Sequence, residues 1–134
     1  MKPLAVTAQD VHSSIRVLIV DDEPLFRQVL ESLLDVEQGV EIVGKGANGK
    51  QAVKLAQELE PDVIVMDVSM PVMDGLEATR EIRDQDPSAR VLILTGGTSV
   101  TDVDKARTAG ASSYLTKDRI AAELVDEIRN LGAK

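Results

Sequence analysis

Five polar residues lie at or just after the ends of short apolar runs, and their types are suited to metal and phosphorus chemistry. They are Asp21 and Asp22 after residues 15–20, Asp67 after residues 63–66, Thr95 after residues 91–94 and Lys117 after residues 112–115. Three carboxylates that meet at one place repel each other, each pair by about 4 kcal/mol at about 4 Å if the effective dielectric constant is about 20. A cation must therefore compensate them, and oxygen ligands without His or Cys favour Mg²⁺.

A carboxylate beside a metal ion and an ammonium group can attack phosphorus and form an acyl phosphate. Asp67 is the candidate nucleophile, because it ends the central apolar run and a tight loop follows at residues 68–71. Asp21 and Asp22 are then the candidate metal ligands. Lys117 supplies a second positive charge that can neutralise a transferred phosphoryl group.

The Thr95 hydroxyl could donate a hydrogen bond to a phosphoryl oxygen. Gly96 and Gly97 follow it and leave space and free backbone N–H groups for an anion. Taken alone, however, Thr95 could be structural and Asp67 a turn residue. Lys117 could be a solvated lysine, and the acidic pair could merely cap a helix. The functional hypothesis depends on all five residues meeting at one edge of a sheet. Separate structural explanations would have to account for each of the five positions independently.

The apolar runs predict the strands that position these residues. Their hydrophobicity is continuous rather than alternating, which is typical of strands buried on both faces of a parallel sheet. The expected strands are residues 15–20, 40–43, 63–66 and 91–94, with a weaker edge strand at residues 112–115.

Helical patterns separate the expected strands. Apolar residues spaced by three and four predict a first helix whose stripe is Leu25, Phe26, Val29, Leu30, Leu33 and Leu34, with Pro24 in its first turn. The next two helices are expected to begin at Asn48 and Asp74, which are N-cap residue types. The fourth helix, residues 100–109, has few apolar residues, so burial should hold it loosely. The fifth is expected to open at Asp118, with Gly132 as its C-cap.

Strand and helix alternate five times, which predicts an α/β fold: a doubly wound, five-stranded parallel sheet with helices on both faces. Such sheets bind ligands at the carboxyl ends of their strands. The length of 134 residues suits one domain. We expect a flexible leader at residues 1–14 and the domain at residues 15–132.

Composition excludes several classes of function. The chain has 15 Lys and Arg against 23 Asp and Glu, a net charge of -8, and only two aromatic residues, so we expect no direct nucleic-acid binding. No apolar stretch approaches the roughly 18 residues of a membrane span, so no membrane association is expected. The chain has no cysteine, which excludes disulfides and thiolate chemistry and suits the cytoplasm.

Residues 15–131 resemble the receiver domain of bacterial two-component response regulators, the CheY-like family. The most specific segment is PDVIVMDVSMPVMDGLE at residues 61–77, which is similar to the phosphoacceptor strand and loop of that family. The acidic pair, Thr95 and Lys117 match its other motif positions in order. The segment YLTKD at residues 114–118 resembles the NarL/LuxR-type subgroup. The resemblance implies the flavodoxin-like strand order 2-1-3-4-5.

The resemblance also implies a mechanism. Asp67 would accept a phosphoryl group from the phosphohistidine of a sensor histidine kinase. Asp22, Asp67 and the backbone carbonyl of Ser69 would ligate Mg²⁺, with Asp21 acting mainly through water. The protein would be a signalling phosphoacceptor that assists its own phosphorylation and dephosphorylation with Lys117, rather than an enzyme.

The family switch would use Thr95 and Tyr114. Thr95 would move toward the phosphoryl group, and Tyr114 would rotate inward. This would change the face made by the fourth helix, fifth strand and fifth helix, which would control an output domain or partner, with a transcriptional output expected. A homodimer through this face, or through the first and fifth helices, is a further expectation. A stand-alone receiver and a fragment cut from a helix-turn-helix protein both remain open.

Three other functions can be compared with the sequence. A haloacid dehalogenase-type phosphatase needs a second acid two residues after its nucleophile, where Ser69 stands. A P-loop or dinucleotide binder needs a glycine-rich loop after the first strand, where the sequence has DDEP at residues 21–24. The serious alternative is an unphosphorylated pseudo-receiver that acts as a protein-interaction module.

Overall fold

Five parallel strands form the central sheet of the computed structural model, in the order β2-β1-β3-β4-β5. The strands are β1 (Ile15–Val20), β2 (Val40–Gly46), β3 (Val63–Asp67), β4 (Val91–Thr95) and β5 (Ser113–Thr116). The predicted fold class and strand order are therefore confirmed. All residues of β3 and β4 are buried, in agreement with their continuous apolar runs.

The structure describes residues 14–96 and 100–133. The leader expected at residues 1–14 falls outside this description except for Ser14. Gly97, expected to offer a backbone N–H group to an anion, also lies outside it.

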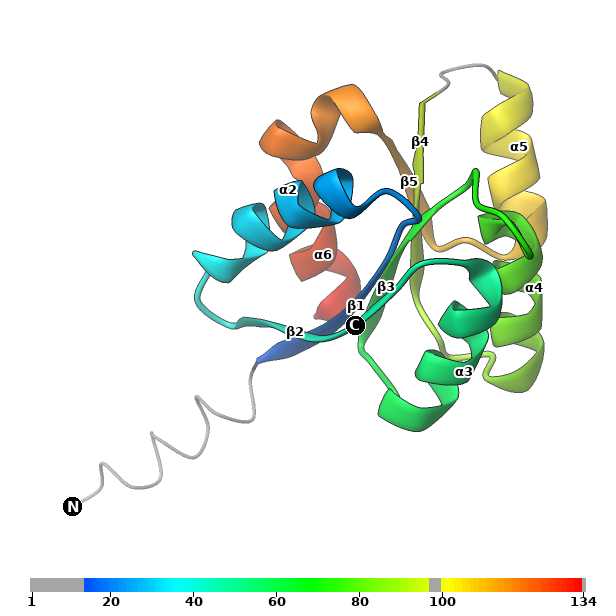
Figure 1. Cartoon of the computed structure of the whole chain (residues 1–134), viewed down its shortest axis with the longest axis horizontal. Helices are drawn as coiled ribbons and strands as arrows, with labels where there is room; N and C mark the ends of the chain where they lie inside the picture. The colour runs from blue at the N-terminus through cyan, green and yellow to red at the C-terminus, as the bar shows by residue number, and fades with distance from the viewer. Residues whose placement is uncertain (1–13, 97–99, 134) are drawn as a thin grey trace.

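Helices cover both faces of the sheet (Figure 1). On one face lie α2 (Pro24–Asp35) and α6 (Ile120–Gly132), and on the other lie α3 (Gly49–Leu59), α4 (Gly75–Gln85) and α5 (Val100–Ala109). The predicted caps of α3 and α4 are confirmed: Asn48 accepts a hydrogen bond from the Gln51 N–H group, and Asp74 accepts one from the Glu77 N–H group.

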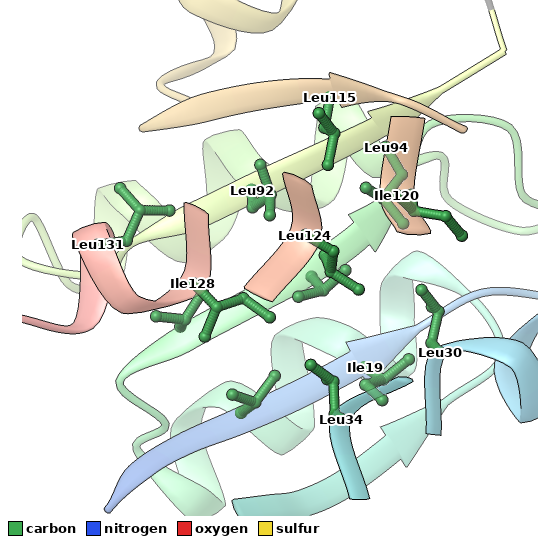
Figure 2. Packing of buried hydrophobic residues seen from close by; sticks show 13 residues of the cluster. Ile19, Leu30, Leu34, Leu92, Leu94, Leu115, Ile120, Leu124, Ile128 and Leu131 are labelled. Atoms are coloured by element: carbon green, nitrogen blue, oxygen red, sulfur yellow. The ribbon is translucent and has the colours of Figure 1, made fainter. Parts of the chain in front are cut away.

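The larger core packs one face of the sheet against α2 and α6 (Figure 2). Leu30 and Leu34 of α2 and Leu124 and Ile128 of α6 are fully buried there. Burial of each such side chain contributes about 1.5–3 kcal/mol, which fixes both helices against the sheet. On the other face, α5 contributes buried Ala106 and Ala109. That small area agrees with the predicted loose attachment of this helix.

The first helix buries a narrower stripe than its sequence predicts. Leu25 is 76% exposed and Val29 is 45% exposed, whereas Leu30 and Leu34 are fully buried. The apolar residues of α2 cover more of its circumference than the sheet can cover.

The last helix begins and ends differently from the prediction. Asp118 lies in a 3-10 turn, η1 (Lys117–Arg119), and α6 begins only at Ile120. Gly132 is not a left-handed C-cap, because it is the last helical residue and Ala133 caps the helix with right-handed backbone angles. A Cβ atom at Gly132 would lie 2.7 Å from the Ile15 side chain, so glycine is needed there for close packing.

Two strand boundaries also differ. The second strand extends to Gly46 rather than ending at residue 43, and its register with β1 shifts between Val17 and Leu18. The fifth strand is displaced by one residue and ends at Thr116. Its last residue pairs with Thr95, so Lys117 follows β5 directly.

Candidate functional site

The strand ends bring the predicted carboxylates together. Asp21 and Asp22 directly follow β1, and Asp67 is the last residue of β3, the strand beside it. One carboxylate oxygen from each residue lies within 4.8 Å of the others. Asp21 is fully buried and Asp67 nearly so, whereas Asp22 is the most accessible of the three. The cluster is therefore open to solvent on the Asp22 side.

Backbone contacts fix Asp21 in this cluster. Its N–H group donates to the Gly46 carbonyl of β2 at 3.0 Å, and its carbonyl accepts from Arg27 Nη1 at 2.6 Å. One carboxylate oxygen, Oδ1, accepts from the Glu23 N–H group at 2.8 Å, which turns the chain into α2. The other oxygen, Oδ2, is buried, and no hydrogen bond to it is found within the described residues.

Lys117 places its ammonium group among the carboxylates. Nζ lies 3.1 Å from Asp67 Oδ1 and 3.6 Å from Asp21 Oδ2, and the side chain is 25% exposed. Its third neighbour is the ring of Phe26, whose centroid is 4.4 Å from Nζ. The ammonium group is thus held by residues from β3, from the end of β1 and from α2.

The charges of the site are strongly coupled. Burial raises the pKa of Asp67 to about 6, and the nearby charges of Asp21 and Asp22 act in the same direction, while Lys117 opposes them. Burial by itself would lower the pKa of Lys117, yet its hydrogen bond to Asp67 and the charges of Asp67 and Asp21 raise it. The contact between Asp67 and Lys117 therefore favours the charged form of both groups.

The donor set fits Mg²⁺. One ammonium group cannot neutralise three carboxylates, and the buried Asp21 Oδ2 has only the Lys117 ammonium group at 3.6 Å, with no hydrogen bond found in the described part of the chain. All candidate ligands are hard oxygens, which Mg²⁺ prefers. Ser69, whose carbonyl was the further expected ligand, lies exposed two residues after Asp67.

The loop after Asp67 packs tightly under the site. The Gly75 N–H group donates to the Val68 carbonyl at 2.8 Å, and a Cβ atom at Gly75 would lie 2.1 Å from the Asp67 carbonyl oxygen. Only glycine allows α4 to begin this close to β3. Val72, at the tip of the loop, has a φ of 70° and is 77% exposed.

The two candidate switch residues lie on neighbouring strands. Thr95 ends β4, is buried and pairs in register with Thr116. Tyr114 lies on the edge strand β5 and is 37% exposed, so its side chain reaches solvent. Gly96, which follows Thr95, is exposed, and a Cβ atom there would meet nothing within 4 Å.

Comparison with known proteins identifies the family of the chain. Residues 17–129 match the response regulator receiver domain family. The chain belongs to this family.

Relatives of the receiver domain include LuxR-type regulators. This chain is 41% identical over 116 residues to the response regulator protein VraR of Staphylococcus aureus, and the match covers 87% of this chain and 56% of VraR. A LuxR-family two-component response regulator from Aurantimonas sp. SI85-9A1 is 40% identical, with a TM-score of 0.86 over 90% of this chain and 86% of that one. These relatives support the NarL/LuxR-type subgroup. The chain spans about half the length of the curated relatives it matches.

A second similar structure comes from the CheX-CheY-BeF3-Mg²⁺ complex from Borrelia burgdorferi. It has 25% identity and a TM-score of 0.85, over 94% of this chain and 95% of that chain. Within the described ranges of the receiver domain, no helix has the length and apolar character needed to cross a bilayer.

Two neighbours of the site were not identified from the sequence. The sequence predicts Phe26 only as part of the apolar stripe of the first helix, and it predicts no role for Arg27. Phe26 is one of two aromatic residues in the chain, which was the available signal. The spacing of apolar residues in α2 predicts the face of the helix on which Phe26 lies. It does not predict the contact with Lys117, which is distant in the sequence.

Proposed function

We propose that this receiver domain accepts a phosphoryl group on Asp67 from the phosphohistidine of a sensor histidine kinase, in a Mg²⁺-dependent reaction. One observation carries the proposal: the nearly buried Asp67 carboxylate lies within 4.8 Å of two further carboxylates and 3.1 Å from the Lys117 ammonium group. Membership of the receiver family supports the same reaction.

The transfer step uses Asp67 as the nucleophile. A carboxylate oxygen of Asp67 attacks phosphorus, an O–P bond forms, the P–N bond to the imidazole breaks, and its electron pair returns to the ring nitrogen. In the metal-free domain burial raises the pKa of Asp67 to about 6, so its carboxylate is mostly ionised at neutral pH before an ion binds. The ionised form is the one that can attack phosphorus.

Asp22, Asp67 and the Ser69 carbonyl would hold Mg²⁺, with Asp21 acting mainly through water. The bound ion would compensate the carboxylates and neutralise charge on the phosphoryl oxygens. Lys117 would pair with one of those oxygens, since its ammonium group already contacts Asp67. The same groups would assist hydrolysis of the acyl phosphate, so the domain would also promote its own dephosphorylation.

Phosphorylation would change the face formed by α5, β5 and α6. The modification adds about -1.5 to -2 charges beside Thr95, which would move toward the phosphoryl group while Tyr114 rotates inward. The partial exposure of Tyr114 and the small buried area of α5 support this rearrangement. The result would be a shift between two packings of one face.

The switched face would control an output domain or partner, and the LuxR-type relatives favour a transcriptional output. A homodimer through the α5, β5 and α6 face, or through α2 and α6, would couple phosphorylation to that output. The charge of -8 supports a chain that does not itself bind nucleic acid. A role between a sensor kinase and transcription would require the domain to act in the cytoplasm.

Incubation with acetyl phosphate and Mg²⁺, followed by intact-mass analysis, tests the proposal. We expect the mass of one phosphoryl group to be added when Mg²⁺ is present, and not to be added when EDTA is present during the incubation or when Asp67→Asn is used. Asp86→Asn is a matched control at the far end of α4 and should be modified like the parent. If the parent is not modified and does not bind beryllofluoride with Mg²⁺, the pseudo-receiver is the correct alternative.

A further inference from the structure

Phe26 gives the Lys117 ammonium group a contact that carries no charge. The ring centroid lies 4.4 Å from Nζ, within the roughly 6 Å over which a cation is attracted to an aromatic face. The other two neighbours of Nζ are carboxylates, Asp67 at 3.1 Å and Asp21 at 3.6 Å. Lys117 therefore has two charged contacts and one aromatic contact, each from a different element.

We propose that Phe26 is a positioning residue that holds the Lys117 ammonium group at the phosphoryl acceptor. This inference rests on the proposed function, and it assigns to α2 a part in the reaction. A lysine side chain is long and flexible, and its ammonium group is strongly hydrated. The Lys117 side chain is 25% exposed. Without a third contact, solvent would compete for it.

The aromatic contact matters most when Asp67 is engaged elsewhere. In the transfer step, Asp67 forms a bond to phosphorus and loses its negative charge, so its attraction for Lys117 falls; a bound Mg²⁺ would weaken that attraction further. The attraction of the Phe26 ring does not depend on the charge of Asp67. The ring would therefore keep the ammonium group near the incoming phosphoryl oxygens throughout the step.

The position of the ring is itself well fixed. Phe26 lies in the first turn of α2, and the next residue, Arg27, donates to the Asp21 carbonyl at 2.6 Å. Leu30, one turn further along the helix, is fully buried in the core. Phe26 is partly buried against the same core. The first turn of α2, which carries the ring, is thus tied to the end of β1, where Asp21 lies.

Three variants separate positioning from packing. Phe26→Leu keeps apolar volume but removes the aromatic face, and Phe26→Tyr keeps the face. Leu33→Ala reduces contact of another partly buried α2 residue with the same core and lies two turns away from the site. Each variant is phosphorylated with acetyl phosphate at saturating Mg²⁺, and its Mg²⁺ affinity is measured separately.

We expect Phe26→Leu to slow phosphorylation about fivefold, the size of a partly exposed cation–π contact, and to change Mg²⁺ affinity less than about twofold. Phe26→Tyr should restore the parent rate, and Leu33→Ala should lower stability without slowing the reaction. The inference is overturned if Phe26→Leu reacts like the parent, if Phe26→Tyr is as slow as Phe26→Leu, or if Leu33→Ala is equally slow.

A second readout does not depend on the reaction. In ¹H–¹³C spectra of the full chain, the ring should shift the ε-protons of Lys117 upfield, and Lys117→Arg assigns that signal. The upfield shift should be lost in Phe26→Leu and kept in Phe26→Tyr, and an unshifted parent signal would overturn the contact. If the shift is present but the parent is not phosphorylated, the proposed function fails and with it the role of Phe26 in transfer. If the parent is phosphorylated and Phe26→Leu is phosphorylated at the same rate, only the inference about Phe26 is refuted, and the proposed function stands.

Discussion

Replacement of Asp67 by asparagine should stabilise the receiver domain at pH 7 in Mg²⁺-free buffer. The carboxylate has a pKa of about 6 in the folded chain against an ordinary value of 3.8. That difference corresponds to about 3 kcal/mol by which folding disfavours the ionised form. Asparagine cannot ionise, so Asp67→Asn should raise the free energy of unfolding by up to about 3 kcal/mol.

The size of this stabilisation should depend on pH in a characteristic way. Between about pH 4 and pH 6 the folded state binds more protons at Asp67 than the unfolded state does, so the contribution of this group to stability falls as pH rises. The stability difference between Asp67→Asn and the parent should therefore be small near pH 4, grow through pH 6 and level off above about pH 7. Mg²⁺ should stabilise the parent more than the variant.

Urea unfolding followed by circular dichroism, at several pH values and with EDTA present, measures this difference. Asp86→Asn is a control of opposite sign, because hydrogen bonds from Ser88 lower the pKa of the exposed Asp86 carboxyl. The ionised Asp86 carboxyl therefore stabilises the folded state at pH values above its ordinary pKa, and this stabilisation is lost as the pH falls. A pH-independent difference for Asp67→Asn, or a variant less stable than the parent at pH 7, would refute the reasoning.

Three further substitutions test the loops and caps around the site by the same unfolding assay. Gly75→Ala should cost at least about 2 kcal/mol, because its Cβ atom would lie 2.1 Å from the Asp67 carbonyl oxygen; wild-type stability would show that this contact is not tight. Val72→Gly should add about 0.5–1 kcal/mol by relieving a φ of 70°, and a loss of stability would contradict that strain. Asn48→Ala should cost about 1 kcal/mol through loss of the hydrogen bond from Gln51, and no change would mean that solvent replaces the cap.

The fold and the location of the candidate site could be predicted because both depend on local pattern. Fully buried strands appear in the sequence as continuous apolar runs, and their parallel arrangement puts their carboxyl ends at one edge. Asp67 and Thr95 were therefore expected at that edge, where β3 and β4 end. The N-caps Asn48 and Asp74 act within their own first turns, so they could be predicted as well.

The remaining features depend on contacts between distant parts of the chain. Gly132 is a residue type that is common at helix C-caps, but glycine is needed at this position because the Ile15 side chain packs against it. Leu25 fits the helical stripe, yet the sheet does not reach it. The contact between Phe26 and Lys117 joins α2 to the end of β5. None of these contacts has a signal in local spacing, since each is set by the relative placement of two elements.

Identification of the modified residue tests the central claim most directly. After reaction with acetyl phosphate and Mg²⁺, borohydride reduction converts an aspartyl phosphate to homoserine, and peptide mass spectrometry locates it. We predict homoserine at position 67 alone, only when Mg²⁺ is present. Homoserine at another aspartate, or none after reaction of the folded parent chain, would contradict the assignment of Asp67 as the phosphoacceptor.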